Sequence, residues 1–463
     1  MASDDVYPLF MLDDNKILHG IVVTWTLRFN DLLDADRLHT SLCRLLSIGD
    51  WRKVGGRLVR KVSPTSLEIH VPPQFTPARP ALTYSHTANP SDIDDHPLAK
   101  TLPKATPTPS IQRGSNEFRD FECRKDAPAT LEDYLINDTP ILSLHITSFN
   151  DATIIGLTWP HVLMDVMGQQ ALLRGWSLVL AGKESEVPAL LGAREDALLF
   201  PDNQEVYHPQ RLQGFGMFKF GLRFVADLLW NRVVETRTIF LPKAAVAKLQ
   251  LQAQEDLSGE FVSEGDVLTA WATRAVASSM PPRPITALHP LNLRFRLPSL
   301  IEAPGVFVQN MAVSAFSLFT PELLRGPLGP IALENRRQLM EQATEPQLLA
   351  LLREMRQSYT PGSDTTVLCG ESHALLMPFT NWTRANVYQA ADFSSAVVRA
   401  GEGDSRNNPP GTMVYQHANS MRSSPTMRNV VVIHGKDHGD NYWLTALLLP
   451  AAWAKIEEEI KKL

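Results

Sequence analysis

The sequence predicts an α+β protein made of two halves, each a mixed β-sheet flanked by helices. With 463 residues, the chain exceeds what one hydrophobic core usually organises, so more than one compact unit is expected. Hydrophobic residues make up 44% of the chain and charged residues 20%, which is typical of a globular protein. Strand-like and helix-like segments follow one another without the regular alternation of βαβ units, which favours an α+β fold over a parallel α/β fold.

The composition also excludes several kinds of partner. The formal net charge of −6 argues against nucleic acid, because binding to phosphates needs a basic surface. The first residues, MASDDVYPLFML, lack the basic and then apolar pattern of a secretory signal, and no apolar run approaches the roughly 20 residues that cross a bilayer. Three cysteines lie far apart, which favours neither a disulfide framework nor a metal site. We therefore expect a cytoplasmic protein with no membrane partner and no metal.

The first elements come from local apolar patterns. Residues 17–29 carry apolar side chains at alternate positions and predict a strand. Residues 34–46 carry leucines at helical spacing, with Asp34 or Asp36 as the N-cap. The proline-rich segment 64–109 is predicted to be a surface loop with short edge strands.

A hairpin and a helix follow. Segments 141–149 and 152–159 are rich in apolar and β-branched residues and flank the turn Asn150-Asp151, which predicts a β-hairpin. Residues 166–181 predict a helix that ends at Gly182. Residues 161–165 therefore occupy a joint between a strand and a helix, where a side chain can be held rigidly and still face a cleft.

The second half repeats this mixture after a segment, 188–218, that lacks clear periodicity. The proposed division is an N-terminal half at 1–200, a crossover at 201–235 and a C-terminal half at 236–463. Within that half, strands are expected at 237–241, 285–293, 306–314, 430–433 and 442–449. Helices are expected at 244–252, at 263–278 with a capping box, through Leu333, Leu339 and Leu349, and at 450–463.

The sharpest chemical feature is the pattern H-x-x-x-D at His161 and Asp165, followed by Gly168. A neutral histidine can remove a proton from an alcohol near pH 7 and return it to a leaving group, which typically contributes ~10²–10⁴-fold in rate. Asp165 could bond the imidazole, or it could turn away and pair with an arginine. The alternative is that His161 is an ordinary hydrogen-bonded histidine at the end of a strand.

Several further segments, in order along the chain, resemble the motifs of the BAHD acyltransferase superfamily, and in particular its fungal branch of trichothecene acetyltransferase-type enzymes. The matching segments are LHTSL at 38–42, GGRL at 55–58, HVLMD at 161–165, VSEGDVLTAW at 262–271, NLRFR at 292–296, GVFVQN at 305–310, TNW at 380–382 and DFS at 392–394. The family's D-F-G-W-G loop is eroded here, because its two glycines and its tryptophan are replaced.

The resemblance implies a role for each matched residue. His161 would be the general base. Asp165 would pair with Arg294, or as a second choice with Arg296. This pairing would fix the joint and so serve the catalytic centre. Thr380 would donate a hydrogen bond to the oxyanion of the tetrahedral intermediate. Trp382 and Gly168 would line the acceptor pocket, and Ser263 would contact coenzyme A. Asp392 would have a structural role in its loop.

The implied activity is an acyl-CoA-dependent O-acyltransferase that moves an acetyl or short acyl group to a hydroxyl of a terpenoid or polyketide. The resemblance also implies a monomer with two chloramphenicol acetyltransferase-like halves, an active-site tunnel between them, acyl-CoA as co-substrate and no covalent acyl-enzyme. Two alternatives stay open. One is a condensation-type transferase that uses a carrier-protein donor or an amine acceptor, although Pro160 stands where such enzymes have a second histidine. The other is a non-catalytic, ligand-binding paralogue.

Two competing patterns are weaker. Gly370-Glu371-Ser372-His373-Ala374 lacks the last glycine of a nucleophile elbow. The polar residues of 434–440 include two histidines and two aspartates, but they lie in an expected hairpin turn, where polar residues are usual.

Overall fold

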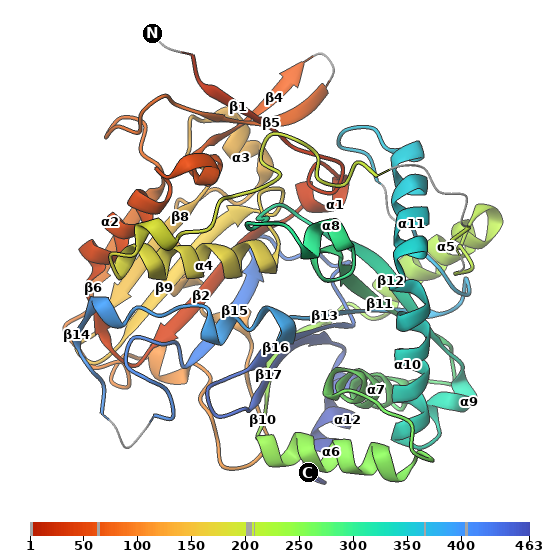
Figure 1. The fold of residues 1–463 in the computed structure, drawn as a ribbon. Coiled ribbons are helices and arrows are strands. Elements are labelled where there is room, and N and C mark those ends of the chain that lie inside the picture. The colour runs from red at the N-terminus through yellow and green to blue at the C-terminus, as the bar shows by residue number, and fades with distance from the viewer. Residues whose placement is uncertain (1–2, 63–64, 201–205, 208, 365–366, 403–405) are drawn as a thin grey trace.

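Two large β-sheets lie beside one another and carry helices on their faces (Figure 1). The structure is a computed structural model that describes residues 3–62, 65–200, 206–207, 209–364, 367–402 and 406–463. Parts of three predicted segments lie outside these ranges: residue 64 of the proline-rich segment, and residues 201–205 and 208, which belong to both the aperiodic segment and the crossover.

The first sheet has five strands in the order β15-β2-β9-β8-β6. Their bounds are Tyr415–Ser420 for β15, Val22–Phe29 for β2, Thr153–Pro160 for β9, Ser143–Ser148 for β8 and Thr83–Ala88 for β6. Strands β8 and β9 pair antiparallel, which confirms the predicted hairpin. Helices α2 (Ala35–Leu45) and α4 (Val166–Leu180) pack against each other and cover one face of this sheet (Figure 1).

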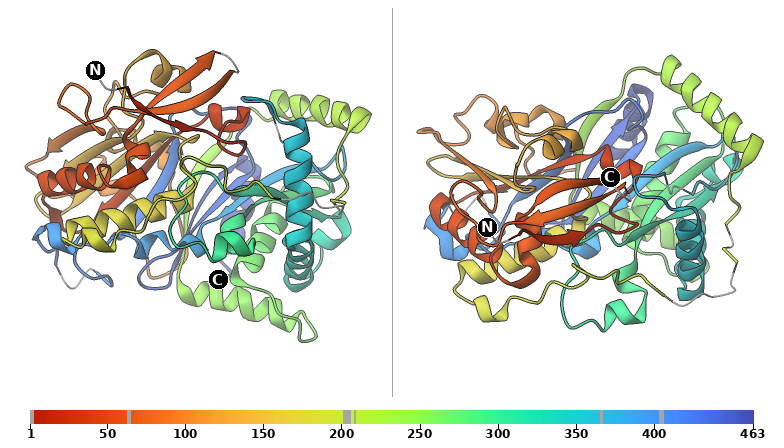
Figure 2. Two further views of the ribbon diagram at one scale, coloured as in Figure 1. Left: turned by 45° about the horizontal axis from the view of Figure 1, so that its top comes forward. Right: turned by 90° about the horizontal axis from the view of Figure 1, so that it is seen from above.

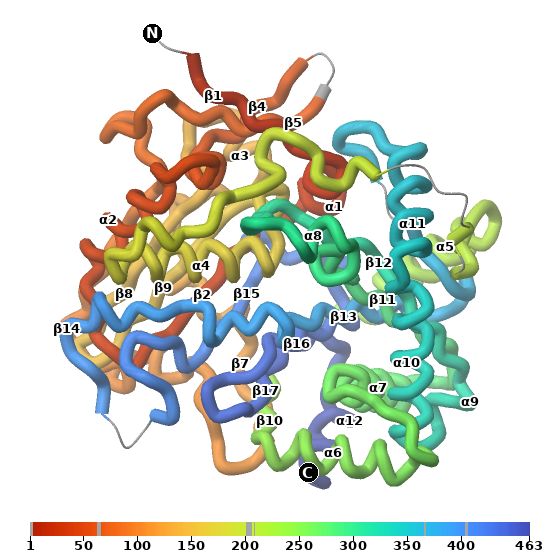
Figure 3. The backbone as a smooth tube through the Cα atoms, in the orientation of Figure 1, coloured from red at the N-terminus to blue at the C-terminus, as the bar shows by residue number. Residues whose placement is uncertain are grey.

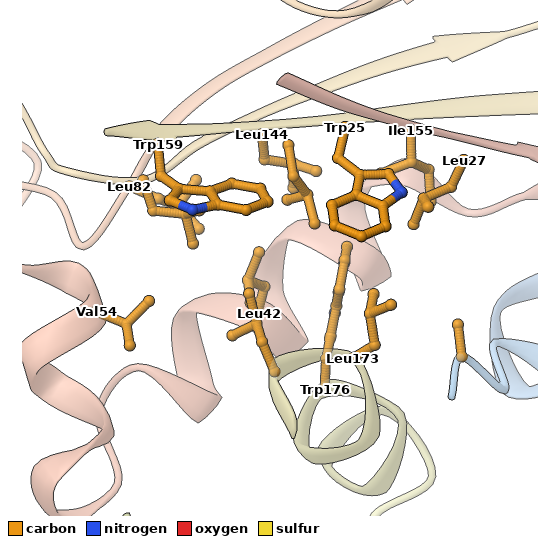
Figure 4. Packing of buried hydrophobic residues seen from close by; sticks show 14 of the residues in the cluster. Trp25, Leu27, Leu42, Val54, Leu82, Leu144, Ile155, Trp159, Leu173 and Trp176 are labelled. Atoms are coloured by element: carbon orange, nitrogen blue, oxygen red, sulfur yellow. The ribbon is translucent and has the colours of Figure 1, made fainter. Parts of the chain in front are cut away.

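Tryptophans and leucines fill the space between this sheet and its helices (Figure 4). Trp25 and Trp159 project from neighbouring strands toward Leu42 of α2 and Trp176 of α4 (Figure 4). The indole N–H of Trp176 donates to the carbonyl of Leu38 at 3.0 Å, so the buried polar atom is satisfied. Because the helices are fixed on the sheet in this way, the residues that join β9 to α4 have little freedom.

The second sheet has seven strands in the order β12-β11-β13-β16-β17-β10-β7. Their bounds are Ala312–Phe319, Ile285–Asn292, Leu375–Asn381, Val430–Lys436, Tyr442–Leu448, Glu235–Leu241 and Ser110–Arg113, respectively. Four helices form its main cover: α6 (Lys243–Glu255), α7 (Glu264–Ala277), α10 (Leu328–Gln342) and α12 (Pro450–Ile460). Helix α7 contacts β11 and β13 directly and packs against the other three helices.

Each sheet contains one strand from the other half of the chain. Strand β15, at 415–420, pairs with β2 along its whole length, and Figure 3 places the blue β15 beside the red β2. Strand β7, at 110–113, pairs with β10 at the edge of the second sheet. The two halves are thus interlocked through backbone hydrogen bonds as well as through side chains.

The remaining elements are short or peripheral. A small sheet joins β1 (Asp5–Pro8), β5 (Thr65–Val71) and β4 (Arg57–Val62), and a two-stranded ribbon joins β14 (Val397–Arg399) to β3 (Leu32–Leu33). The other helices are α1 (Lys16–His19), α3 (Leu131–Ile136), α5 (Gly214–Trp230), α8 (Pro298–Ile301), α9 (Pro321–Leu324) and α11 (Glu345–Ser358). Within the described residues, no helix combines the length and the apolar character that crossing a bilayer demands.

Several predictions differ from the structure. The strand expected from residue 17 begins at Val22, because Asn15 caps the short helix α1 before it. The single helix expected through Leu333 to Leu349 is two helices, α10 and α11. The second begins anew after Thr344, with Pro346 in its first turn, a position that proline tolerates because it needs no backbone N–H there. Finally, α5 begins inside segment 188–218, which lacks clear periodicity in the sequence.

The predicted strand at 306–314 is also wrong in its first part. Strand β12 begins only at Ala312. Before it, the carbonyls of Phe307 and Gln309 accept hydrogen bonds from Arg294, and the N–H of Met311 donates to Asp165. These backbone groups are used by side chains and do not pair in the sheet.

Candidate active site

His161 is the first residue after β9, in the predicted joint between a strand and a helix. Its backbone N–H donates to the carbonyl of Ile21 at 2.9 Å, so the backbone here stays in register with the neighbouring β2. The next three residues, at 162–164, are fully buried, and the side chain of Asp165 caps α4. The joint is therefore anchored at both ends.

His161 is a half-buried residue. The Nδ1 atom of its ring is buried and has no hydrogen-bond partner among the described residues. The Nε2 atom does not share both of these properties. Desolvation lowers the pKa of His161 from its ordinary value, although its own carbonyl, Asp165 and Asn310 act in the opposite direction. The ring is therefore biased toward its neutral form, which can accept a proton.

Asp165 does not bond the imidazole; it braces the joint. Its Oδ1 accepts from the N–H groups of Met167 and Gly168, both at 3.0 Å, and caps α4. The guanidinium of Arg294 donates to both carboxylate oxygens, at 2.9 and 3.1 Å, and the N–H of Met311 donates at 3.1 Å. The pairing expected for Asp165 and Arg294 is thus present, whereas Arg296 donates instead to the carbonyl of Asn292.

Arg294 ties the joint to the second half of the chain. Only 9% of its side chain is exposed, and besides Asp165 it bonds the carbonyls of Phe307 and Gln309. Gly168 meets the same segment, because a Cβ on Gly168 would lie 2.1 Å from the carbonyl oxygen of Val308. Glycine here permits close packing of α4, and its assignment to the acceptor pocket stays a prediction.

Trp382 lies where the two sheets meet. Its ring stacks on Trp25, with centroids 4.8 Å apart, and meets His434 edge-on at 5.0 Å. Trp25 stacks in turn on Trp159, two residues before His161. A row of three indoles therefore connects the strand that leads into His161 to the end of β13.

Thr380 precedes Trp382 by two residues on β13. It is half-buried and aligned with Val432 of β16. Its hydroxyl makes no side-chain hydrogen bond within the described part of the chain, so it is free to donate to a bound group.

A family model described as Transferase family matches residues 120–401, more than half of the chain. The chain belongs to the Transferase family, the BAHD acyltransferases. It is 35% identical to "O-acetyltransferase PaAT-2" of Phomopsis amygdali, over 99% of this chain and 98% of the relative. It is also 35% identical to "Acetyltransferase pyiB" of Pyricularia grisea, over 100% and 94% of the two chains.

Solved structures confirm the fold class of this BAHD acyltransferase. The structure of F. graminearum TRI101 complexed with coenzyme A and T-2 mycotoxin matches with a TM-score of 0.68 at 16% identity, over 99% of this chain and 98% of the other. Vinorine synthase matches with a TM-score of 0.59 at 17% identity, over 99% and 93%. The prediction of an α+β fold in two mixed-sheet units with flanking helices was therefore correct, and so was the prediction that the chain is an acyltransferase.

Ser263 of the acyltransferase caps helix α7 in the predicted capping box with Asp266. Its hydroxyl lies 2.6 Å from Oδ2 of Asp266, which also accepts from the N–H of Ser263. A Cβ on Gly265 would lie 2.7 Å from the amide nitrogen of Asn381. The N-terminus of α7 therefore lies beside the end of β13, close in sequence to Thr380 and Trp382.

Asp392 lies on an exposed loop, and its structural role stays a prediction. Its N–H donates to the hydroxyl of Ser177 on α4, and its Oδ1 accepts from the N–H of Ser394. The adjacent Phe393 is buried against Phe29 and Trp176 of the first half. The eroded D-F-G-W-G segment of this acyltransferase thus still packs the two halves together.

The hairpin turn after β16 is a structural turn in the acyltransferase. Asp437 accepts from the indole of Trp443, and Asp440 pairs with Lys243. His434, which was expected in this turn, lies instead within strand β16 and is bonded to Thr445. Over the described ranges, no group of three or more histidine, cysteine, aspartate or glutamate side chains is placed to hold a metal ion.

Sequence reasoning missed one support of the acyltransferase site. The side-chain amide of Asn310 donates to the carbonyl of His161 at 2.9 Å and to Oδ1 of Asp13 at 2.9 Å. Asp13 is buried, and desolvation raises its pKa to about 6 although the buried Lys53 opposes this shift. Asn310 belongs to a segment matched by motif, but the sequence offers no signal that pairs it with Asp13, 297 residues away.

Proposed function

We propose that this acyltransferase moves an acetyl or other short acyl group from acyl-CoA to a hydroxyl of a specialised metabolite, with His161 as general base. The observation that carries the proposal is the position of His161, a half-buried residue that is held by its backbone between two anchored elements and biased toward its neutral form. Support for the donor and acceptor classes comes from the relatives' names and from TRI101, whose structure was solved with coenzyme A and T-2.

The reaction follows from these groups. Neutral His161 accepts the proton of the acceptor hydroxyl while its oxygen attacks the thioester carbonyl. The oxyanion of the tetrahedral intermediate accepts a hydrogen bond from Thr380. When the intermediate collapses, the C–S bond breaks and the imidazolium returns its proton to the thiolate of coenzyme A. Both substrates meet directly, so no covalent acyl-enzyme forms.

The other residues position the reactants. Asp165 and Arg294 fix the backbone that carries His161, while Trp382 and Gly168 border the acceptor pocket. Ser263 contacts coenzyme A at the N-terminus of α7, where unpaired N–H groups and the helix dipole favour an anion. In this proposal the substrates enter a tunnel between the two halves, and the enzyme acts as a cytoplasmic monomer.

A panel of donors and acceptors tests the proposed chemistry. The purified enzyme is incubated with acyl-CoA thioesters of increasing length and with matched alcohols and amines, and products are identified by mass spectrometry. We expect esters from short acyl-CoA donors. Exclusive use of a carrier-protein thioester, or exclusive formation of amides, would replace this proposal with the condensation-type alternative.

Thr380→Val should lower kcat about 10²-fold, because one hydrogen bond to the oxyanion is worth ~3 kcal/mol in other enzymes. KM should change little, since the bond strengthens only in the transition state. The matched control is Thr83→Val, which removes a half-buried hydroxyl from strand β6 of the first sheet. Equal activity of the two variants would remove Thr380 from the mechanism.

The pH dependence of kcat/KM should show an acid limb centred below pH 6.5. Burial lowers the pKa of His161 from its ordinary 6.5, so the base stays neutral to a lower pH than free imidazole and is lost only as the pH falls through the lowered value. Initial rates of coenzyme A release between about pH 5 and 8 measure this limb. A midpoint at or above 6.5 would argue against His161 as the titrating base.

A further inference from the structure

Helix α5 (Gly214–Trp230) stands apart from every other long helix in its exposure. None of its 17 residues is buried. Of the eighteen large apolar side chains that are exposed among the described residues, seven lie between 215 and 233. Figure 2 shows α5 along the outer edge of the molecule, away from the two sheets. Such a concentration of exposed apolar surface indicates a contact with something outside the chain.

The exposed apolar side chains form one stripe along the helix. They recur at intervals of three and four residues, which places them on a single face. The stripe consists of Phe215, Phe218, Leu222, Val225 and Leu229, each more than half exposed. The first two rings stack on each other with centroids 6.2 Å apart.

The opposite side of α5 is attached to the protein. The carboxylate of Asp227 pairs with Arg283 at 2.9 Å, and the carbonyl of Asp227 accepts from Arg428 at 2.9 Å. Phe220, Phe224 and Leu228 on the remaining faces are half-buried. These contacts fix the helix with its apolar stripe turned outward.

The exposed charged side chains of residues 213–233 are all positive. Lys219, Arg223 and Arg232 are exposed, whereas the only carboxylate of residues 213–233, Asp227, is used by Arg283. Trp230, at the end of the helix, is 89% exposed. Apolar side chains bordered by cations and an indole are typical of helices that lie in the interface of a lipid bilayer.

We propose that α5 adsorbs this enzyme to an anionic lipid surface, with the stripe in the acyl-chain boundary and the cations among the headgroups. The basic charge of α5 favours an anionic lipid surface as its partner. This charge is a local feature, since the chain as a whole is acidic with a net charge of −6. A second copy of the chain fits less well, because two stripes facing each other would bring the cations together without a carboxylate between them. Adsorption needs no helix that spans the bilayer, and it replaces the sequence-based expectation of no membrane partner.

Co-sedimentation with vesicles tests this proposal on the full-length protein. We expect binding to vesicles of phosphatidylcholine with phosphatidylserine, much weaker binding to phosphatidylcholine alone, and a loss of binding as salt is raised. Lys219→Glu with Arg223→Glu should weaken binding by at least about fivefold for each cation removed. Phe218→Asp with Leu222→Asp should abolish it.

Controls separate adsorption from misfolding and from self-association. Ile136→Asp changes another exposed apolar residue, on α3, and should bind as the wild type does. All α5 variants should keep wild-type activity on a water-soluble acceptor. Lys219→Glu and Arg223→Glu change exposed side chains and should disturb folding least. The proposal is overturned if wild-type protein ignores anionic vesicles, if Ile136→Asp loses as much binding as the α5 variants, or if light scattering finds a dimer that the stripe substitutions dissociate.

Discussion

His161→Ala should remove nearly all acyl transfer and leave the fold intact. General base catalysis by a positioned histidine contributes ~10²–10⁴-fold, so the loss of kcat/KM should fall in that range. Stability should change little, because the backbone hydrogen bonds of His161 survive the substitution. The rate of coenzyme A release and the thermal unfolding midpoint measure the two effects.

The matched control is His86→Ala, which removes an exposed histidine from strand β6 at the edge of the same sheet. It should retain full activity. A His161→Ala enzyme that still transfers acyl groups at the wild-type rate would eliminate the proposed base, whatever the structure around it.

Arg294→Ala should lower the free energy of unfolding by about 3–5 kcal/mol, because it leaves the carboxylate of Asp165 buried without its counter-charge. The carbonyls of Phe307 and Gln309 lose their donor in the same substitution, which adds unsatisfied buried acceptors. Activity should fall as well, since the segment that holds His161 in place loosens. Urea unfolding and steady-state kinetics on the same preparation measure both losses.

Two comparisons test this interpretation. Arg44→Ala breaks the exposed pair with Glu184 and should leave the unfolding midpoint close to that of the wild type. Asp165→Asn keeps a good N-cap but removes the charge that pairs with Arg294, so it should lower stability and rate together. An Asp165→Asn enzyme with wild-type stability and no activity would mean that Asp165 takes part in the chemistry itself.

The sequence predicted best what depends on neighbours in the chain. The β8–β9 hairpin, helix α4 with its end at Gly182, and the capping box at Ser263 all follow from local patterns of apolar, β-branched and capping residues. The pairing of Asp165 with Arg294, 129 residues apart, was available only through resemblance to a family.

Predictions from the sequence were wrong where side chains from distant parts of the chain bond the backbone. Residues 306–311 have the composition of a strand, but Arg294 and Asp165 take the backbone groups that a sheet would need. The bond between Asn310 and Asp13 likewise depends on how the whole chain is folded. Helix α5 was missed because glycines at its start obscured a helical pattern whose apolar face has no core to meet.

The exchange of strands between the two sheets constrains how the enzyme is made. Strand β2 emerges from the ribosome early, yet its partner β15 follows almost 400 residues later, with Trp25 aligned to Ala418. Until then β2 is an open, apolar sheet edge, which is a known risk for aggregation during synthesis. The sheet that contains β2 therefore stays incomplete until β15 has been made, and chaperones that shield this edge should matter for the yield of active enzyme.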